Sequence, residues 1–300
     1  REQMFEQHSD QLAALQILSD ELGFFEAIDA QHRAFHVTAG ETLLVTFESG
    51  AKLWGPDVAT ALNASLLMIH ADGPTWFRSP DLFDFVDDLT DKGFFDGFET
   101  VLFAGAGMGA YGAGAFCVAA PGAEVLLMQP IATLERAKVP WEVRNRKAWS
   151  LRWGPRYSYA PRSVQAANHV TVISDPTETL DAMHASLFQD DHTTHLRIPH
   201  AGPRVLTTLH GMNLLTPLCK AAMAGALTRP TFAKLWRARR DYRPYIKGLL
   251  KKLIKTDRRA LVRHLSRHTL ARKELTSPAQ ERDLVSEALD KAKTVRAQSL

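Results

Sequence analysis

The chain has 300 residues, of which 45% are hydrophobic and 23% are charged, a balance that is ordinary for a soluble globular protein. Its length suits one large domain, or one domain with an appendage. No apolar run approaches the roughly 18–20 residues that a membrane-spanning helix needs, which argues against that class of protein. Two cysteines, Cys117 and Cys219, are too few for a disulfide scaffold. Because the first residues also lack a signal-peptide pattern, we expect a cytoplasmic protein.

The net charge of +3 hides an asymmetry between two parts of the chain. Residues 234–273, called the basic arm, contain 15 Lys and Arg and two acidic residues, so this segment carries +13. The remainder of the chain therefore carries −10. The sequence thus combines an acidic body with a basic C-terminal arm.

Hydrophobic periodicity and stop signals predict strands and helices in alternation up to about residue 198. The predicted helices cover residues 10–28, 79–93, 111–120 and 177–188. The predicted strands cover residues 43–49, 65–73, 101–104, 124–128, 169–174 and 194–198. After these elements the chain reads as helical to its end. The strand–turn–helix–strand order of residues 101–128 implies a parallel sheet with right-handed crossovers.

The turn after residues 101–104 is the most informative stretch. Gly105-Ala106-Gly107-Met108-Gly109-Ala110 matches G-x-G-x-x-A, the pattern of a dinucleotide-binding turn. That pattern also requires an acidic residue at the tip of the next strand to hold the ribose, and the tip here reads Met128-Gln129-Pro130. Nucleotide or dinucleotide binding through residues 105–110 is one alternative for this turn.

The same residues fit a nucleophile elbow, the pattern G-x-S-x-G on a sharp strand-to-helix turn. VLFAGAGMGAYGAGAF followed by PGAEVLLMQP resembles a bacterial α/β-hydrolase-like family whose elbow reads close to G-x-S-M-G-G-Y-x-A. The residues that match are Gly105, Met108, Gly109, Tyr111 and Ala113, whereas Ala110 replaces a glycine and Gly107 replaces the serine. The resemblance implies a three-layer α/β-hydrolase-like parallel sheet with a lid-like insert and a helical C-terminal arm. The domains are then residues 1–39 (an N-terminal helical segment), 40–210 (the α/β domain, with the insert at 131–166) and 211–300 (a helical basic region).

Glycine at position 107 has a direct chemical consequence, because it has no side chain that could attack a carbonyl. Loss of the serine nucleophile costs a well-studied hydrolase on the order of 10⁶ in turnover. No Ser or Cys lies within residues 101–116, and Cys117 is too far along the predicted helix to reach the turn. We therefore expect no covalent acyl transfer at this elbow.

The rest of a triad is predicted by chain order, which in this fold is nucleophile, acid and histidine. Asp175 follows the strand 169–174, and His200 follows the strand 194–198, although both residues also suit ordinary strand-end turns. Two functions follow from this pattern. The protein binds an anionic ligand or a protein partner without catalysis, or it is a hydrolase in which Asp175 and His200 activate a water on an ester-type substrate.

The resemblance extends over most of residues 40–250. The segments DGPTWFRSPDLFDFVDDLTDKGFFDGFETVLF, SDPTETLDAMHASLF and FAKLWRARRDYRPYIKGLL are similar to uncharacterised alphaproteobacterial proteins that are often labelled phosphoadenosine phosphosulfate reductase. Such a reductase has an SGG-x-DS phosphate loop and a catalytic cysteine in an ECGLH-like motif. Neither motif is present, and Cys219 lies in TPLCKAAMAG. The motifs therefore do not support that reductase activity.

The insert at 131–166 combines arginine with tryptophan and tyrosine, which can stack on rings and bind phosphates, sulfates or carboxylates. In one interpretation these side chains only pack the insert onto the sheet. In the other they form a pocket over the Gly107 turn for an anionic, sugar-like or nucleotide-like ligand. Backbone N–H groups at that turn can also hold an anion. If the insert forms this pocket, the candidate ligand-binding residues are those of the elbow together with Trp141, Arg144, Arg152, Trp153 and Arg156.

The basic arm has apolar residues at helical spacing, and Pro244 should kink or divide its helix. Three interpretations compete: docking of the apolar face on the acidic body, binding to an anionic membrane, and binding to nucleic acid. His192 and His195 form a His-x-x-His pair, but nothing nearby completes a metal-ligand set. We expect no metal and no cofactor.

Overall fold

The computed structural model of the protein describes residues 2–50 and 53–273. The chain divides into two compact units between Leu235 and Trp236. The first unit contains one sheet of eight strands in the order β1-β2-β4-β3-β5-β6-β7-β8. The strands are β1 (Gly23–Ala27), β2 (His32–Val37), β3 (Thr42–Glu48), β4 (Ser65–Ala71), β5 (Thr100–Ala106), β6 (Glu124–Met128), β7 (His169–Ser174) and β8 (Thr193–Arg197).

The sheet is mixed, with an antiparallel edge. β1 pairs antiparallel with β2, and β2 pairs antiparallel with β4. All pairs from β4 through β3, β5, β6 and β7 to β8 are parallel. Because parallel strands end at the same edge, the loops after β3, β5, β6, β7 and β8 lie along one edge of the sheet. Residues that directly follow these strands are therefore gathered at this edge.

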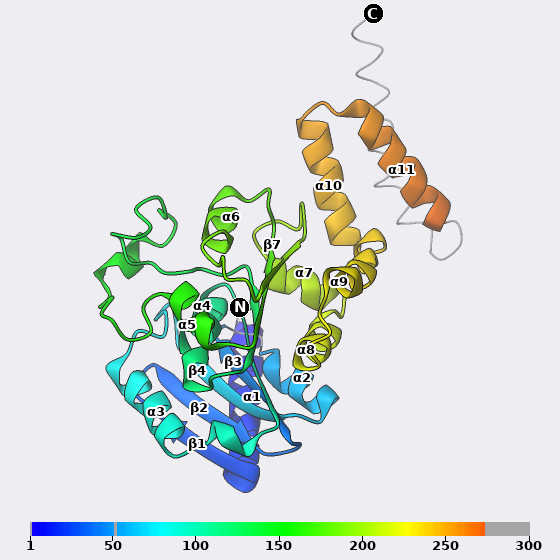
Figure 1. Ribbon diagram of the computed structural model, residues 1–300. Coiled ribbons are helices and arrows are strands. Elements are labelled where there is room, and N and C mark those ends of the chain that lie inside the picture. The colour runs from blue at the N-terminus through cyan, green and yellow to red at the C-terminus, as the bar shows by residue number, and fades with distance from the viewer. Residues whose placement is uncertain (1, 51–52, 274–300) are drawn as a thin grey trace, which may run out of the picture. The chain divides into compact units, whose positions relative to one another are not determined.

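Helices cover both faces of the sheet (Figure 1). The helices of the first unit are α1 (Glu2–Leu22), α2 (Gly55–Leu62), α3 (Pro80–Asp91), α4 (Met108–Phe116), α5 (Ala160–Ser163), α6 (Thr179–Ala185), α7 (Val205–Gly211), α8 (Leu215–Met223) and α9 (Arg229–Leu235). α4 packs on β3, β5 and β6 from one side, while α2 and α8 contact each other and the sheet from the other. The predicted three-layer arrangement is confirmed.

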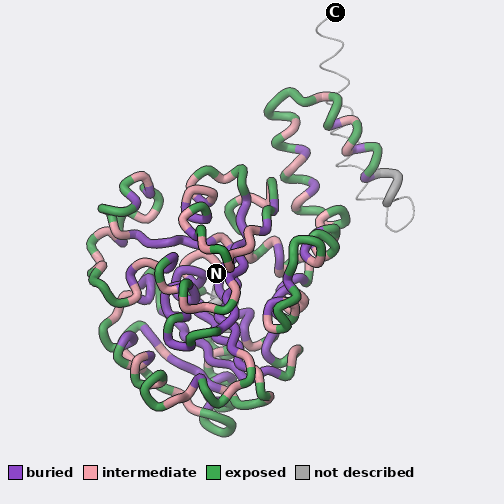
Figure 2. The backbone as a smooth tube through the Cα atoms, in the orientation of Figure 1, coloured by how far each residue is buried: buried purple, intermediate pink, exposed green. Residues whose placement is uncertain are grey.

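The core follows the central strands, which are buried along almost their whole length (Figure 2). On the α4 face, Phe47 stacks on Phe116 with ring centroids 5.2 Å apart. Phe116 also stacks on Tyr157 of the insert at 4.2 Å. Strands that are covered on both faces read as continuous apolar runs, which is why their positions could be predicted.

The N-terminal segment differs from the prediction. The helix expected over residues 10–28 ends at Leu22, and β1 and β2, which the sequence analysis did not predict, follow it. A Cβ atom on Gly23 would lie 2.1 Å from the carbonyl oxygen of His36, so only glycine allows this close pairing of β1 with β2. Strand pairing across a hairpin, which periodicity within one segment does not reveal, decided the structure here.

The second unit contains α10 (Arg243–Lys255) and α11 (Arg259–Lys273). As expected, Pro244 divides the helical arm: it lies in the first turn of α10, after the short 3-10 helix Trp236–Arg240. Ile246 and Leu250 of α10 pack with Val262 of α11. The apolar face of α10 is therefore at least partly covered within its own unit. No helix among the described residues is both long enough and apolar enough to cross a membrane.

Candidate functional site

The turn predicted as an elbow joins β5 to α4, with Gly107 at its apex. Gly107 has φ +58° and ψ −116°, a conformation that is strained for other residues and that glycine adopts readily. A Cβ atom on Gly105 would lie 2.1 Å from the carbonyl oxygen of Gly109, and one on Gly109 would lie 2.1 Å from that of Phe47. A Cβ atom on Gly107 would meet nothing within 4 Å. Two glycines are therefore required by crowding, whereas the apex has room for a side chain.

Hydrogen bonds fix the backbone of this turn. The N–H of Gly107 donates to the carbonyl of Met128 at the end of β6 over 2.9 Å, and the N–H of Tyr111 donates to the carbonyl of Gly107 over 3.1 Å. The N–H groups of residues 108–110 precede this first helical bond, so they belong to the unpaired end of α4. Residues 106–108 are half-buried. The positive end of the helix is thus partly accessible at the turn.

Aromatic side chains surround the start of α4. The sulfur of Met108 accepts the backbone N–H of Trp76 at 3.3 Å. The ring of Tyr111 lies edge-on between Trp76, at 6.1 Å, and Trp153 of the insert, at 5.7 Å. Trp76 and Phe77 both have positive φ, 53° and 52°, so the loop after β4 is held in a strained conformation against the elbow.

The predicted acid and histidine lie close together in the loops after β7 and β8. The carboxylate of Asp175 is fully buried and accepts the backbone N–H of His200 at 3.1 Å and of Gly202 at 2.8 Å. It also accepts the N–H and the hydroxyl of Thr177, both at 2.8 Å. Asp175 therefore ties the two loops together through their backbones.

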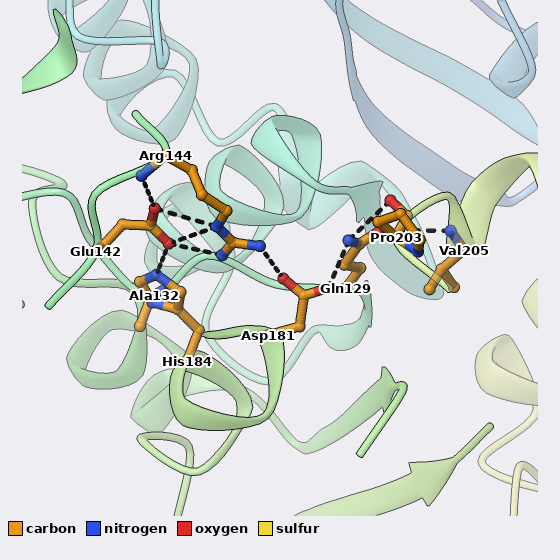
Figure 3. Close-up of polar contacts among 8 residues, drawn as sticks. All are labelled: Gln129, Ala132, Glu142, Arg144, Asp181, His184, Pro203 and Val205. Atoms are coloured by element: carbon orange, nitrogen blue, oxygen red, sulfur yellow. Dashed lines mark hydrogen bonds and ion pairs between the residues drawn. The ribbon is translucent and has the colours of Figure 1, made fainter. Parts of the chain in front are cut away.

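The insert begins with a polar cluster in which the carboxylates of Glu142 and Asp181 are buried, shown in Figure 3. Arg144 donates to Glu142, with Nε–Oε2 at 3.0 Å, and to Asp181 of α6, with Nη1–Oδ1 at 2.6 Å. Asp181 also accepts the side-chain amide of Gln129 at 2.6 Å. Gln129 follows β6 directly and in addition donates to the carbonyl of Pro203 at 3.0 Å. Loops after β6 and β8, the insert and α6 thus meet in one network.

His184 of α6 completes this cluster. Its Nδ1 accepts the backbone N–H of Ala132 at 3.2 Å, so its Nε2 carries the proton and donates to Glu142 at 3.1 Å. The ring of Trp141 lies 4.6 Å from that of His184. Burial on its own would raise the pKa of Glu142, but hydrogen bonds from His184 and Arg144 lower that pKa to about 2. The cluster holds Glu142 in its charged form.

The end of the insert is held by Arg78, a residue that the sequence analysis did not single out. Its guanidinium donates to the carbonyls of Arg152 at 3.0 Å, Arg156 at 2.8 Å and Tyr157 at 2.8 Å. It also lies over the rings of Phe83 and Trp153. Arg78 thereby fixes the insert to the start of α3, immediately beside Tyr111.

The candidate ligand-binding residues are therefore dispersed. Arg144 and Trp141 lie at the α6 cluster, Trp153 lies beside Tyr111, and Arg152 is exposed. Arg156 pairs with Asp84 at 2.8 Å and with Asp87 of α3. Two of the three arginines thus have carboxylate partners within the protein. The sequence contains one indication of the polar cluster at α6. Asp181 and His184 are three residues apart, so they share one face of a predicted helix.

Another buried acid, Glu48, ends β3. Its carboxylate accepts the N–H of Trp54 at 2.8 Å, the hydroxyl of Thr46 at 2.9 Å and the N–H of Gly55 at 2.9 Å. Burial raises the pKa of Glu48 to about 7 despite these hydrogen bonds. In hydrolases with an elbow, the loop after β3 supplies an oxyanion-hole N–H. Glu48 therefore anchors the end of a loop beside the candidate site.

The His-x-x-His pair has other contacts. The Nε2 atom of His192 is 3.0 Å from the carbonyl oxygen of Val164, and that of His195 is 2.7 Å from the carbonyl oxygen of Phe188. Among residues 2–50 and 53–273, no group of three or more His, Cys, Asp or Glu side chains is arranged to hold a metal ion. Both cysteines are buried free thiols, and burial raises the pKa of Cys219 to about 12.

The sheet has eight strands and is mostly parallel, and its strand β5 ends in a sharp turn whose apex residue has positive φ. This arrangement is the one that displays a nucleophile elbow. The chain has an α/β-hydrolase fold. No family model and no curated protein matches the sequence.

Several solved structures of hydrolases and acyltransferases are similar to this chain at low sequence identity. An esterase of Pyrobaculum calidifontis shares 15% identity, with 76% of this chain and 94% of that chain covered and a TM-score of 0.44. MGS-MChE2, an α/β hydrolase enzyme from a lagoon-sediment metagenome, shares 11% identity, with 65% and 97% covered and a TM-score of 0.42. The capsule O-acetyltransferase of Neisseria meningitidis serogroup A shares 12% identity, with 68% and 99% covered and a TM-score of 0.42.

Proposed function

We propose that this α/β-hydrolase-fold protein is a binding protein without covalent catalysis, which holds a small anionic ligand over the Gly107 turn. The observation that carries the proposal is the apex of the elbow, where glycine leaves open space instead of a nucleophile. The first N–H groups of α4 face the same turn and favour negative charge. An anion such as a carboxylate fits a helix N-terminus of this kind better than a neutral ligand does.

The arginines of the insert contribute little to the attraction of an anion at the elbow. Because Arg144 and Arg156 are paired with carboxylates, the backbone of α4 supplies the main attraction for an anion at the elbow. Trp76 and Trp153, which flank Tyr111, would then provide apolar walls. This division of roles predicts a small ligand with one acidic group.

A calorimetric screen tests the binding function, with acetate and benzoate as probes and Gly107→Ala as the variant. The added Cβ occupies the space over the turn, so saturable binding should weaken at least about tenfold. A Gly225→Ala variant, which also replaces a positive-φ glycine with open space around it, controls for backbone strain. If neither probe binds, or if both variants bind like the wild type, the proposed elbow site is wrong.

A second function has its own support: His200 lies beside Asp175, with 3.1 Å between its backbone nitrogen and the carboxylate. In that case Asp175 and His200 activate a water that occupies the place of the missing side chain. Hydrolysis of an ester panel by the wild type that disappears in His200→Ala would favour this function. Absence of hydrolysis and of labelling by a fluorophosphonate would favour the binding protein.

A further inference from the structure

A cavity of about 820 Å³ lies away from the elbow. Its lining residues belong to α3, to the segment after α4 and to the insert, including α5, and none of residues 105–109 lines it. A volume of this size is within the range of about 300–1,000 Å³ for small-molecule sites. The walls combine polar side chains with the apolar surfaces of Val118 and Pro155.

The cations of this cavity differ in their availability. Lys138 pairs with Glu135, and Arg156 pairs with Asp84 and Asp87. In the part of the chain that the structure describes, Arg162 of α5 has no carboxylate partner, and its side chain is exposed. Asp87, the carboxylate on the wall, is also bound by the hydroxyl of Tyr157. Arg162 is therefore the group that can receive an acid.

Three hydroxyl groups accompany Arg162. Ser158, Tyr159 and Ser163 all line the cavity, and within residues 2–50 and 53–273 their hydroxyls have no hydrogen-bond partner. Ser158 is 7% exposed as a residue, and its hydroxyl oxygen is not among the fully buried unpaired atoms, so the hydroxyl is accessible from the cavity. Hydroxyls that have no protein partner and are accessible from a cavity are available to hydrogen-bond a ligand.

We propose that this cavity, called the Arg162 cleft, binds an anionic sugar. The guanidinium of Arg162 would hold the acidic group through two parallel hydrogen bonds. The hydroxyls of Ser158 and Ser163 match sugar hydroxyls, which both donate and accept. The ring of Tyr159 and the side chain of Val118 offer an apolar surface to the face of the sugar ring. One unpaired cation favours a ligand with a single acidic group.

Isothermal titration of the full chain tests the Arg162 cleft with three probes: glucuronate, glucose 6-phosphate and glucose. We expect saturable binding of at least one acid and at least tenfold weaker binding of glucose. Arg162→Ala should weaken binding of the acid at least about tenfold, and Tyr159→Phe should weaken it less. Glucuronate and glucose 6-phosphate distinguish a carboxylate from a phosphate as the acidic group.

The matched control is Arg197→Ala, which removes an exposed arginine from β8, outside the cleft. It should bind like the wild type. Gly107→Ala should also bind like the wild type, so the test of the Arg162 cleft does not depend on whether the elbow binds a ligand. Circular dichroism of Arg162→Ala verifies its fold. Arg162→Lys keeps the positive charge but cannot form two parallel hydrogen bonds, so its affinity for the acid should lie between those of the wild type and Arg162→Ala. The proposal is overturned if no acid binds below about 10 mM, or if Arg162→Ala and Arg197→Ala bind equally well.

Discussion

His184 donates a hydrogen bond to Glu142 at 3.1 Å, and neither side chain is exposed to solvent. The pair joins α6 to the first part of the insert. Glu142 also binds Arg144, which binds Asp181 in turn, so removal of Glu142 leaves the buried Nε2 of His184 without its acceptor and takes one of two carboxylates from Arg144. The insert is therefore attached to the sheet domain by charged groups at this end and by Arg78 at the other.

Glu142→Ala should lower the free energy of unfolding by about 3–5 kcal/mol, the range for breaking a buried ion pair. Glu135→Ala, which removes a more exposed glutamate of the same insert, should cost less than about 1 kcal/mol. Urea unfolding at pH 7 measures both. Equal and small effects would mean that the cluster does not hold the insert. Because the pKa of Glu142 is lowered to about 2, its contribution should be lost as the pH falls from 4.5 towards 2.

Glu48 should produce the opposite pH dependence. Its pKa is about 7 in the folded protein, against an ordinary value of 4.5, so the folded state binds the proton more tightly than the unfolded chain does. Stability should therefore fall as the pH rises from 4.5 to 7, by on the order of 3 kcal/mol. Glu48→Gln does not titrate, so the difference in unfolding free energy between wild type and variant should change across this range. A constant difference from pH 4.5 to 8 would contradict the assignment.

The three glycines of the elbow should respond unequally to alanine. Gly105→Ala and Gly109→Ala place a Cβ atom 2.1 Å from backbone oxygens, which cannot move without disturbing β5, α4 or β3. Gly107→Ala meets open space, and its cost should be the backbone strain of roughly 1–3 kcal/mol. Thermal unfolding of the three variants should rank Gly107→Ala as the most stable. A reversed order would show that the turn is not built as described.

Arg78→Ala should release the end of the insert, because the carbonyls of Arg152, Arg156 and Tyr157 lose their shared donor. Limited trypsin digestion should then cut within residues 144–156 several times faster, while the sheet domain stays folded. Arg33→Ala, which removes a half-buried arginine paired with Asp72, is the control and should be cut at the wild-type rate. Equal digestion of both variants would indicate that packing of Trp153 and Tyr157 is sufficient.

The strands of the parallel sheet could be predicted because each is covered on both faces and appears as a short apolar run. β6 illustrates this, since its predicted and observed bounds are both residues 124–128. β1 was missed because it is an edge strand whose residues are all exposed or half-buried, whereas β2 beside it is mostly buried. Their pairing depends on Gly23 meeting His36 across the hairpin, which no local pattern contains.

Residues 101–110 predicted a tight strand-to-helix turn, because Gly105 and Gly109 follow an apolar strand at close spacing, and glycine at position 107 supplies no nucleophile. Which arginines of the insert are available depends instead on contacts between segments that are distant in the chain. Arg144 meets Asp181, which is 37 residues away, and Arg156 meets Asp84, which is 72 residues away, whereas Arg162 faces a cavity without a carboxylate partner among the described residues. Charge pairing acts over a few ångströms in space, so the folded arrangement of distant segments sets it.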